Sequence, residues 1–422
     1  MFLKERLFVL VDRIKENVFL IHVGLLLCIL LGFTLAILGA KKKAFKFLSQ
    51  AHRTGRHMCF KRAVEWWVIK NVDIHQVPVE SYMSLSDFKR CFGSRMMILK
   101  SKQSESEKGV LYVMYSELLH VIPKFMDIDK LSKDYKLVFE PSWSGYCTGS
   151  FLYYACKPFD SYFLAAQVDD YRFLQNFENL KACELGPCDW VDPKVAEPFL
   201  NQPKKYDIVM NSNWGAWKRH RVLFKALKKS KRDLKVALIG FDWGGRSKQD
   251  ILSLAKAYGV DAQIEIFEKI PFDQVMNITC QSKLSVLLSL KEGSNRAVAE
   301  SIFCDVPVIV LENHVGGIVK NVNQYTGQLA PERNLTEVIH DILDSLDSYT
   351  PRNWGVEHIA CDISTIRLNE FLKSTCSVEE KWTKDIVVRS NSPESKYQST
   401  GDKERFSQEN EDLKKYLIAD EV

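Results

Sequence analysis

The sequence predicts an α/β protein with two Rossmann-like domains, preceded by one apolar helix. An apolar run at 283–290 leads into a small-residue turn and a helix over 295–303, and a second apolar run follows at 307–311. The same alternation extends over 206–329, and a weaker one covers 81–200. Strands that alternate with helices form parallel sheets, so both stretches predict α/β domains.

Composition agrees with this class. The 422 residues leave room for two domains and additional segments, and 46% hydrophobic with 26% charged residues is typical of a globular protein. The net charge of +5 is small and lies mainly near the amino end. It does not indicate nucleic-acid binding.

Residues 18–40, after an amino-terminal flank at 1–17, predict a transmembrane helix. This apolar run is long enough to cross ~30 Å of hydrocarbon. A signal peptide is the alternative, but its apolar core would be shorter and a cleavage site should follow. Here Lys41-Lys42-Lys43 comes directly after the run, which favours an anchor.

Flanking charge predicts the orientation of this span. Four Lys and Arg residues precede it, and eight follow within residues 41–62. Positive charge stays on the cytoplasmic side, so a single-pass membrane protein with a cytoplasmic main domain is expected. The odd, scattered set of eleven cysteines agrees with reduced thiols. A type II protein with a lumenal domain is the alternative.

The basic juxtamembrane segment at 41–80 mixes lysines and arginines with aromatic residues. Such a segment beside a membrane span predicts contact with an anionic lipid surface. The alternative is a solvated linker that ends in a buried helix.

Four further segments follow. The first domain, 81–203, has strand candidates at 95–100, 110–115, 135–140 and 161–167. A hinge at Lys204–Asp207 begins the second domain, 204–346. A helical segment at 347–376 is expected to return to the first domain. The polar segment 377–422 predicts disorder, at least over 389–410.

The turn at 292–295 predicts an anion site. Gly293 and Ser294 precede the helix, whose free N–H groups at the carboxyl end of a strand favour a phosphate. Glu292 lies beside that point. Glu300 is eight residues further on, about two helical turns, and could accept hydrogen bonds from a diol such as a ribose. The alternative is a loop glutamate plus an exposed helix glutamate.

This region resembles the carboxyl-terminal domain of the family-4 retaining glycosyltransferases of the GT-B fold. Their signature is Glu, seven residues, Glu, and a Gly-x-Pro strand; here Asp305-Val306-Pro307 replaces Gly-x-Pro. Gly316-Gly317 and Thr326–Leu329 continue the match, which covers about 206–346. The resemblance implies two Rossmann-like domains facing a cleft.

The resemblance also implies roles for individual residues. Lys218 matches the family's diphosphate-binding lysine, whereas the family's arginine falls near Asn213 and is not preserved; Arg219 or Arg221 might substitute. We therefore expect catalytic roles for Glu292 and Lys218. The donor-binding residues expected are Glu300, Gly293, Ser294, Asn295, Arg296 and Arg219.

Members of that family often contact the donor sugar with a histidine from the first domain. The nearest candidates here are His120 and Glu140, which precedes Pro141-Ser142-Trp143. The alternative for 140–145 is an ordinary proline-containing loop with a packed tryptophan.

These observations predict a membrane-anchored, retaining, hexosyltransferase-type enzyme. It would transfer a sugar from a nucleotide-diphosphate sugar to a lipid-linked or glycan acceptor. No Asp-x-Asp motif lies in a loop, so no cofactor and no obligatory metal are expected. The alternative is a catalytically inactive membrane scaffold on the same fold that binds a nucleotide or a protein partner.

Overall fold

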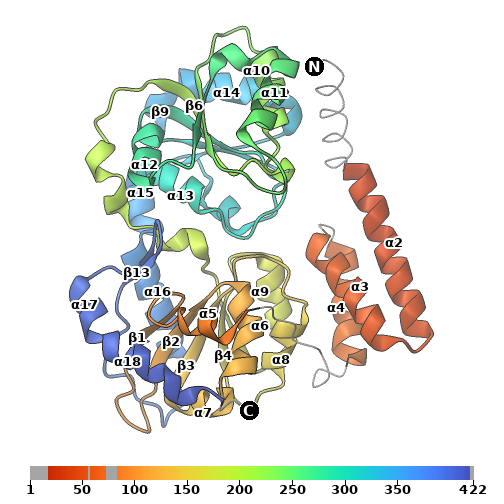
Figure 1. The fold of residues 1–422 in the computed structure, drawn as a ribbon, viewed down its shortest axis with the longest axis vertical. Coiled ribbons are helices and arrows are strands. Elements are labelled where there is room, and N and C mark those ends of the chain that lie inside the picture. The colour runs from red at the N-terminus through yellow and green to blue at the C-terminus, as the bar shows by residue number, and fades with distance from the viewer. Residues whose placement is uncertain (1–17, 56–57, 73–82, 419–422) are drawn as a thin grey trace. The chain divides into compact units, whose positions relative to one another are not determined.

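The computed structural model describes residues 18–55, 58–72 and 83–418, with side chains from Val23 and from Cys59 in the first two ranges (Figure 1). The chain folds as two compact units. We call residues 191–360 the continuous unit and residues 24–190 with 361–422 the split unit. The first division falls between Trp190 and Val191, ahead of the hinge expected at Lys204–Asp207.

The continuous unit holds a six-stranded parallel sheet in the order β11-β10-β9-β6-β7-β8. Numbered along the chain this is 6-5-4-1-2-3, the doubly wound Rossmann order. The strands are β6 (Tyr206–Asn211), β7 (Val236–Gly240), β8 (Ile264–Glu268), β9 (Ser282–Leu287), β10 (Val308–Leu311) and β11 (Gly327–Ala330). The predicted α/β class is confirmed, and the apolar runs at 283–290 and 307–311 correspond to strands β9 and β10.

Helices cover both faces of this sheet. They are α10 (His220–Lys229), α11 (Lys248–Tyr258), α12 (Phe272–Cys280), α13 (Arg296–Phe303), α14 (Leu335–Asp344) and α15 (Pro351–His358). Ile208 and Met210 of β6 pack in one apolar cluster with α10, α11 and α14, whereas Val209 packs with Ile278 of α12. Successive side chains of a strand point to opposite faces, so β6 is buried on both.

The split unit holds a five-stranded sheet in the order β1-β2-β3-β4-β5. The strands are β1 (Met96–Lys100), β2 (Gly109–Met114), β3 (Tyr135–Glu140), β4 (Ser161–Leu164) and β5 (Leu180–Cys183). All neighbours are parallel except β1 and β2. Four strands were expected from the sequence; the fifth, β5, is short and has only half of its residues buried.

Strand order decides where the helices of the split unit lie. The helices between β2 and β5 are α6 (Ser116–Phe125), α7 (Ile128–Asp134), α8 (Gly149–Ala155) and α9 (Val168–Leu174). Parallel crossovers are right-handed, so a sequential strand order places all of these helices on one face. Phe139 of β3 accordingly packs against Tyr154 of α8 and Phe163 of β4. The opposite face needs another cover.

The carboxyl-terminal segment supplies that cover, and the predicted disorder at 389–410 is wrong. Its elements are α16 (Cys361–Ser374), β12 (Arg389–Asn391), β13 (Ser395–Tyr397), α17 (Thr400–Arg405), α18 (Ser407–Asp412) and a 3-10 turn at Leu413–Tyr416. Phe371 of α16 contacts Tyr162 of β4 edge to face, and Lys136 of β3 pairs with Glu380 at 2.8 Å. Few apolar residues suffice here because the sheet provides the apolar surface.

The same segment closes the free edge of β1, beside α18 in Figure 1. The N–H of Ile98 donates to Asn410 Oδ1 at 3.2 Å, and its carbonyl accepts from Tyr397 Oη at 2.9 Å. Val387 N–H donates to the Leu99 carbonyl. An uncovered edge strand would pair with other chains, so the segment also protects the sheet. The helical segment expected at 347–376 is α15 in the continuous unit and α16 in the split unit.

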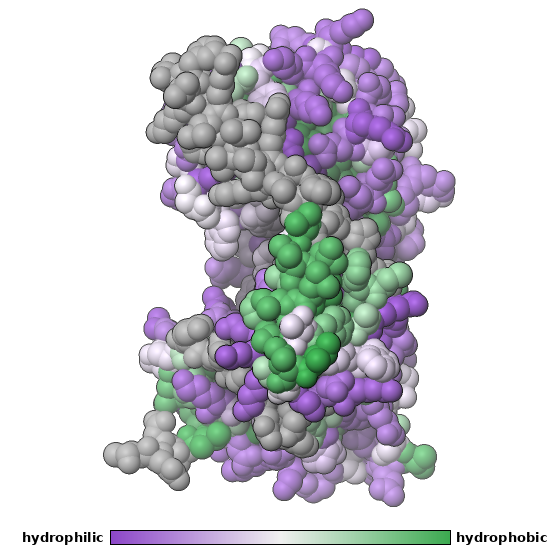
Figure 2. All heavy atoms as spheres, turned by 90° about the vertical axis from the view of Figure 1, so that its right-hand side faces the viewer, coloured by the Kyte–Doolittle hydropathy of each residue, from purple (hydrophilic) through white to green (hydrophobic). Residues whose placement is uncertain are grey.

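Helix α2 (Val18–Ile37) corresponds to the apolar run, and the chain turns back through Gly39 at φ +78°. Leu25 and Ile29 pack against Ala51 of the next helix. Figure 2 shows the outward apolar side chains gathered over α2; they are Leu26, Leu27, Leu30, Leu31 and Ile37.

The predicted transmembrane helix at 18–40 is wrong. Within the described parts of the chain, no helix combines the length and apolar character needed to cross a bilayer. The prediction of a single-pass membrane protein, with its main domain in the cytoplasm or in the lumen, is therefore wrong as well.

A helical arm, α3 (Lys41–Thr54) and α4 (Met58–Asn71), packs on the split unit. Leu48 and Val68 are fully buried in the same apolar cluster as the sheet. Phe45, Leu48 and Trp67 of the basic segment at 41–80 thus face protein, as the buried-helix alternative expected, whereas Phe60 and Trp66 are exposed. Residues 73–80 lie outside the described residues.

Buried ion pairs fix this arm. Glu65 accepts hydrogen bonds from His52 at 2.7 Å and from Arg172 of α9 at 3.0 Å. Lys61 donates to Asp169 at 2.5 Å. Because breaking a buried pair leaves an uncompensated charge, these contacts strongly favour the docked arm.

Candidate functional site

The residues singled out in the second half of the sequence gather at one edge of the continuous sheet. The loop at 212–219 follows β6, and the loop at 288–295 follows β9. Strand order reverses between these two neighbouring strands. Ligands of doubly wound sheets bind outside the carboxyl ends of the strands at such a switch point.

Lys218 and Glu292 meet there. Lys218 Nζ donates to Glu292 Oε1 at 2.8 Å, and both side chains are buried, at 8% and 9% exposure. Ser289 Oγ donates to the same oxygen at 2.5 Å, and Asn295 Nδ2 donates to Oε2 at 2.8 Å. Lys218 Nζ also lies 4.1 Å from the centre of the Trp217 ring. These contacts fix the position of the Glu292 carboxylate. Its negative charge balances the positive charge of Lys218.

Asn295 joins this pair to the start of α13. Its side-chain oxygen caps the helix by accepting from Val298 N–H at 3.1 Å, while its amide holds Glu292. The remaining first-turn N–H groups give this end of the helix partial positive charge. The predicted anion site therefore has a lysine and a capped helix start beside it.

The loop at 314–317 packs closely on this turn. Gly317 N–H donates to the Gly293 carbonyl at 2.6 Å. A Cβ on Gly316 would lie 3.1 Å from the carbonyl oxygens of Glu292 and Gly293. A larger residue at 316 would therefore displace the turn that carries Glu292.

Glu300 lies about one turn after the first residue of α13 and is buried. Arg296, one turn earlier, pairs with it through Nε and Oε1 at 3.1 Å. The arginine side chain is 34% exposed and the glutamate 6%. The structure thus brings two of the expected donor-binding residues together as a pair.

Arg219 has a left-handed backbone, with φ 63°. Its guanidinium donates to Glu332 Oε2 at 2.6 Å and to the Leu288 carbonyl at 3.4 Å. It therefore lies at the carboxyl end of β9 but is tied to a carboxylate. The sequence analysis missed Ser289 and Glu332; Ser289 could have been found three residues before Glu292, whereas only the tertiary fold brings Glu332 here.

His220 follows Arg219 and is fully buried. Burial, together with the positive charge of Lys218, lowers its pKa to about 3. Its Nε2 lies 3.3 Å from Ser212 Oγ. The ring is neutral at physiological pH and adds no charge to the site.

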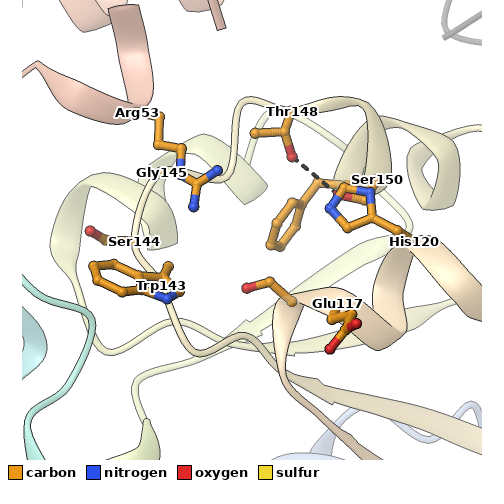
Figure 3. Close-up of a pocket in the computed structure, with 10 residues that line it drawn as sticks. Arg53, Glu117, His120, Trp143, Ser144, Gly145, Thr148 and Ser150 are labelled. Carbon is orange, nitrogen blue, oxygen red and sulfur yellow. Dashed lines mark hydrogen bonds between the residues drawn. The ribbon is translucent and has the colours of Figure 1, made fainter. Parts of the chain in front are cut away.

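His120 and Glu140, the two candidates from the first domain, lie in different places. His120 lines a cavity of about 300 Å³ in the split unit (Figure 3). Glu140 does not line it: its carboxylate is buried on the face covered by the carboxyl-terminal segment, where it accepts from Tyr112 Oη at 2.7 Å. Arg389 lies 3.6 Å from it. Glu140 is almost fully buried, so it belongs to the core; this burial also raises its pKa.

The comparisons with known proteins agree with the Rossmann order of the continuous sheet. Residues 193–355 match the family of glycosyl transferases group 1. The chain contains a glycosyl transferases group 1 domain. This domain coincides with most of the continuous unit, including both loops at the switch point. No curated protein matches the sequence.

One solved structure of low sequence identity shares the fold. Sucrose-phosphate synthase from Thermosynechococcus elongatus is 14% identical, with a TM-score of 0.50; the match covers 62% of this chain and 72% of that one. Anabaena HepE in complex with UDP is 14% identical, with a TM-score of 0.48, over 62% of this chain and 78% of that one. The group 1 domain thus belongs to an α/β protein of the GT-B type with Rossmann-like sheets.

Proposed function

We propose that this protein is a retaining glycosyltransferase that moves a hexosyl group from a nucleotide-diphosphate sugar to a glycan acceptor. The observation that carries the proposal is the buried Lys218–Glu292 pair beside the start of α13, at the switch point of a group 1 domain. The assignment to family 4 and to its Glu-x7-Glu motif is part of this proposal.

In the proposed reaction the bond from the anomeric carbon to the diphosphate oxygen breaks, the acceptor oxygen bonds to that carbon on the same face, and the acceptor hydroxyl gives its proton to the departing diphosphate. Negative charge grows on the leaving phosphate. The Lys218 ammonium and the first N–H groups of α13 would stabilise it, and such charge stabilisation is the main requirement of this chemistry. These groups would serve without a metal ion.

Glu292 would hold the donor sugar and balance positive charge on the ring as the bond breaks. Ser289 and Asn295 support this role because they fix both carboxylate oxygens. Gly293 and Ser294 would lie against the diphosphate. Arg296 and Arg219, each tied to a glutamate, would orient donor-binding carboxylates as well as add positive charge.

Glu300 would bind the ribose diol of the donor. Glu300→Ala should weaken nucleoside diphosphate binding roughly ten- to a hundredfold, since one charged hydrogen bond contributes ~1.5–3 kcal/mol. Isothermal titration with UDP, GDP and ADP measures this. Unchanged dissociation constants for every diphosphate that binds the wild type would refute the role.

The central test is turnover. The purified protein is incubated with UDP-, GDP- and ADP-sugars and with free and lipid-linked glycan acceptors, and nucleoside diphosphate release is measured. Lys218→Gln and Glu292→Gln should each lower the rate about a hundredfold or more, whereas Lys225→Gln, exposed on α10, is the matched control. NMR of the product gives the anomeric configuration.

A catalytically inactive scaffold is not favoured, because the Lys218–Glu292 pair and the group 1 domain are both intact. It predicts nucleotide binding without turnover of any sugar nucleotide. That outcome, or full activity of Lys218→Gln, would overturn the proposed function.

A further inference from the structure

The cavity of about 300 Å³ in the split unit lies at the carboxyl edge of that sheet. Four segments line it: the start of α6 after β2, the loop after β3, the start of α8, and α3 of the helical arm. Figure 3 shows Arg53 reaching toward the cavity from α3, with Trp143 on the same side and Glu117 and His120 across from it.

The loop after β3 has a fixed shape. The N–H groups of Gly145 and Tyr146 both donate to the buried Asp170 carboxylate, at 2.9 and 3.0 Å. Gly145 has φ +101°, a conformation that favours glycine. The loop therefore presents Trp143 and Ser144 to the cavity in one arrangement.

Arg53 is held against this loop. A Cβ on Gly145 would lie 3.0 Å from Arg53 Cα and 3.2 Å from its Cγ. The preceding residue, His52, pairs with buried Glu65, which in turn pairs with Arg172. The backbone at Arg53 is thus held beside the loop, which places its side chain at the cavity wall.

The lining has the chemistry of a site for a charged sugar. Trp143 is 44% exposed, although large aromatic side chains are usually buried, and offers an indole face. Thr148, Ser150 and His120 form a short polar row, with Oγ1 to Oγ at 3.2 Å and Oγ to Nε2 at 3.4 Å. These groups and the Glu117 carboxylate suit hydroxyls, whereas the Arg53 fork matches a carboxylate or phosphate.

We propose that this cavity binds a saccharide that carries a carboxylate or phosphate, with Arg53 of the helical arm selecting the anionic group. The sugar ring would lie on Trp143, and its hydroxyls would face Glu117 and the polar row. The identification of this saccharide as the acceptor rests on the proposed function; the binding itself does not.

Equilibrium binding to the full chain, without donor, tests the proposal. The probes are glucose, glucuronic acid, glucose 6-phosphate and inorganic phosphate, measured by ligand-observed NMR at low salt. Both charged sugars should bind about ten- to a hundredfold more tightly than glucose. Added salt should reduce this preference because Arg53 is exposed to solvent.

Three variants at two residues separate the parts of the site. Arg53→Gln should remove the preference for charged sugars, Arg53→Lys should restore part of it, and Trp143→Ala should weaken all three sugars. Arg62→Gln is the matched control, an exposed arginine of the same arm that does not line the cavity. Circular dichroism verifies that each variant folds.

Each contrary outcome has a distinct meaning. An equal preference in Arg53→Gln and wild type would overturn the role of Arg53. Inorganic phosphate binding as tightly as glucose 6-phosphate would overturn the saccharide site. If the protein turns over sugar nucleotides but shows no preference for charged sugars, this inference is wrong and the proposed function stands. If it shows an Arg53-dependent preference but no turnover, the proposed function is wrong and this inference stands.

Discussion

At the scale of single residues, Lys218 and Glu292 depend on each other because both are buried. Removing the lysine takes the counter-ion from a buried carboxylate, whereas the neutral donors Ser289 and Asn295 remain. Breaking a buried pair costs more than removing both charges, since the remaining charge loses its counter-ion without regaining water.

Lys218→Met should therefore lower the free energy of unfolding of the continuous unit by about 3 kcal/mol. The double variant Lys218→Met/Glu292→Gln should recover at least half of that loss but none of the transfer activity. Urea denaturation of both variants measures the coupling. Strictly additive losses would show that the pair is not coupled.

His220 gives the continuous unit a pH-dependent stability. Its pKa is about 3 in the folded state, against ~6.5 for an unperturbed histidine in the unfolded chain. A lowered folded pKa contributes stability above pH ~6.5 that is lost progressively as the pH falls toward 3.

Between pH 8 and pH 5, His220 should account for about 2 kcal/mol of lost unfolding free energy. His220→Asn, which cannot titrate, should show a correspondingly shallower dependence in urea denaturation at each pH. The comparison is between slopes, so any constant loss of stability in the variant does not affect it. Parallel slopes for the two proteins would contradict the assignment.

At the scale of elements, the carboxyl-terminal segment behaves as part of the core. Phe406 and Tyr416 are fully buried, and Phe406 stacks on Tyr397 with ring centres 5.5 Å apart. Glu107, before β2, accepts from Thr383 of the segment. Burial alone would raise the Glu107 pKa, but hydrogen bonds from Lys100 and Thr383 outweigh it and lower the pKa to about 2.

Phe406→Ala should destabilise the split unit by about 3–5 kcal/mol, as expected for a fully buried aromatic residue. Lys403→Ala, exposed on α17 three residues earlier, should change stability by less than ~0.5 kcal/mol. Urea denaturation followed by tryptophan fluorescence compares them. A disordered segment would give no difference between the two variants.

At the scale of the whole molecule, donor and proposed saccharide sites belong to different units. A nucleoside diphosphate should slow amide hydrogen exchange at 213–220 and 289–300 of the continuous unit, because a ligand stabilises the state it binds. Glucose 6-phosphate should instead protect 116–120 and 143–151. Hydrogen exchange with mass spectrometry resolves these peptides, and protection by the diphosphate confined to the split unit would contradict the donor assignment.

Local sequence patterns predicted the strands and the 292–300 turn and helix of the continuous unit well. Its buried strands read as short apolar runs between turns, and the Glu292–Glu300 stretch combines a capping asparagine, small residues and an amphipathic helix. These are local signals, set by periodicity and by the chemistry of helix starts. Glu292 and Lys218 come together because both lie just after strands that are neighbours in a Rossmann order.

The order of the carboxyl-terminal segment and the positions of Glu140 and Arg53 depend on tertiary packing. The polar segment at 377–418 is ordered because a sequential strand order leaves one sheet face for it to cover, a consequence that composition does not encode. Glu140 looked like a ligand residue at a strand end, yet the pleat turns it toward Tyr112 and Arg389. Arg53 reaches the cavity because its arm docks through ion pairs with residues more than a hundred positions away. Such contacts depend on long-range packing, which no local pattern of residues specifies.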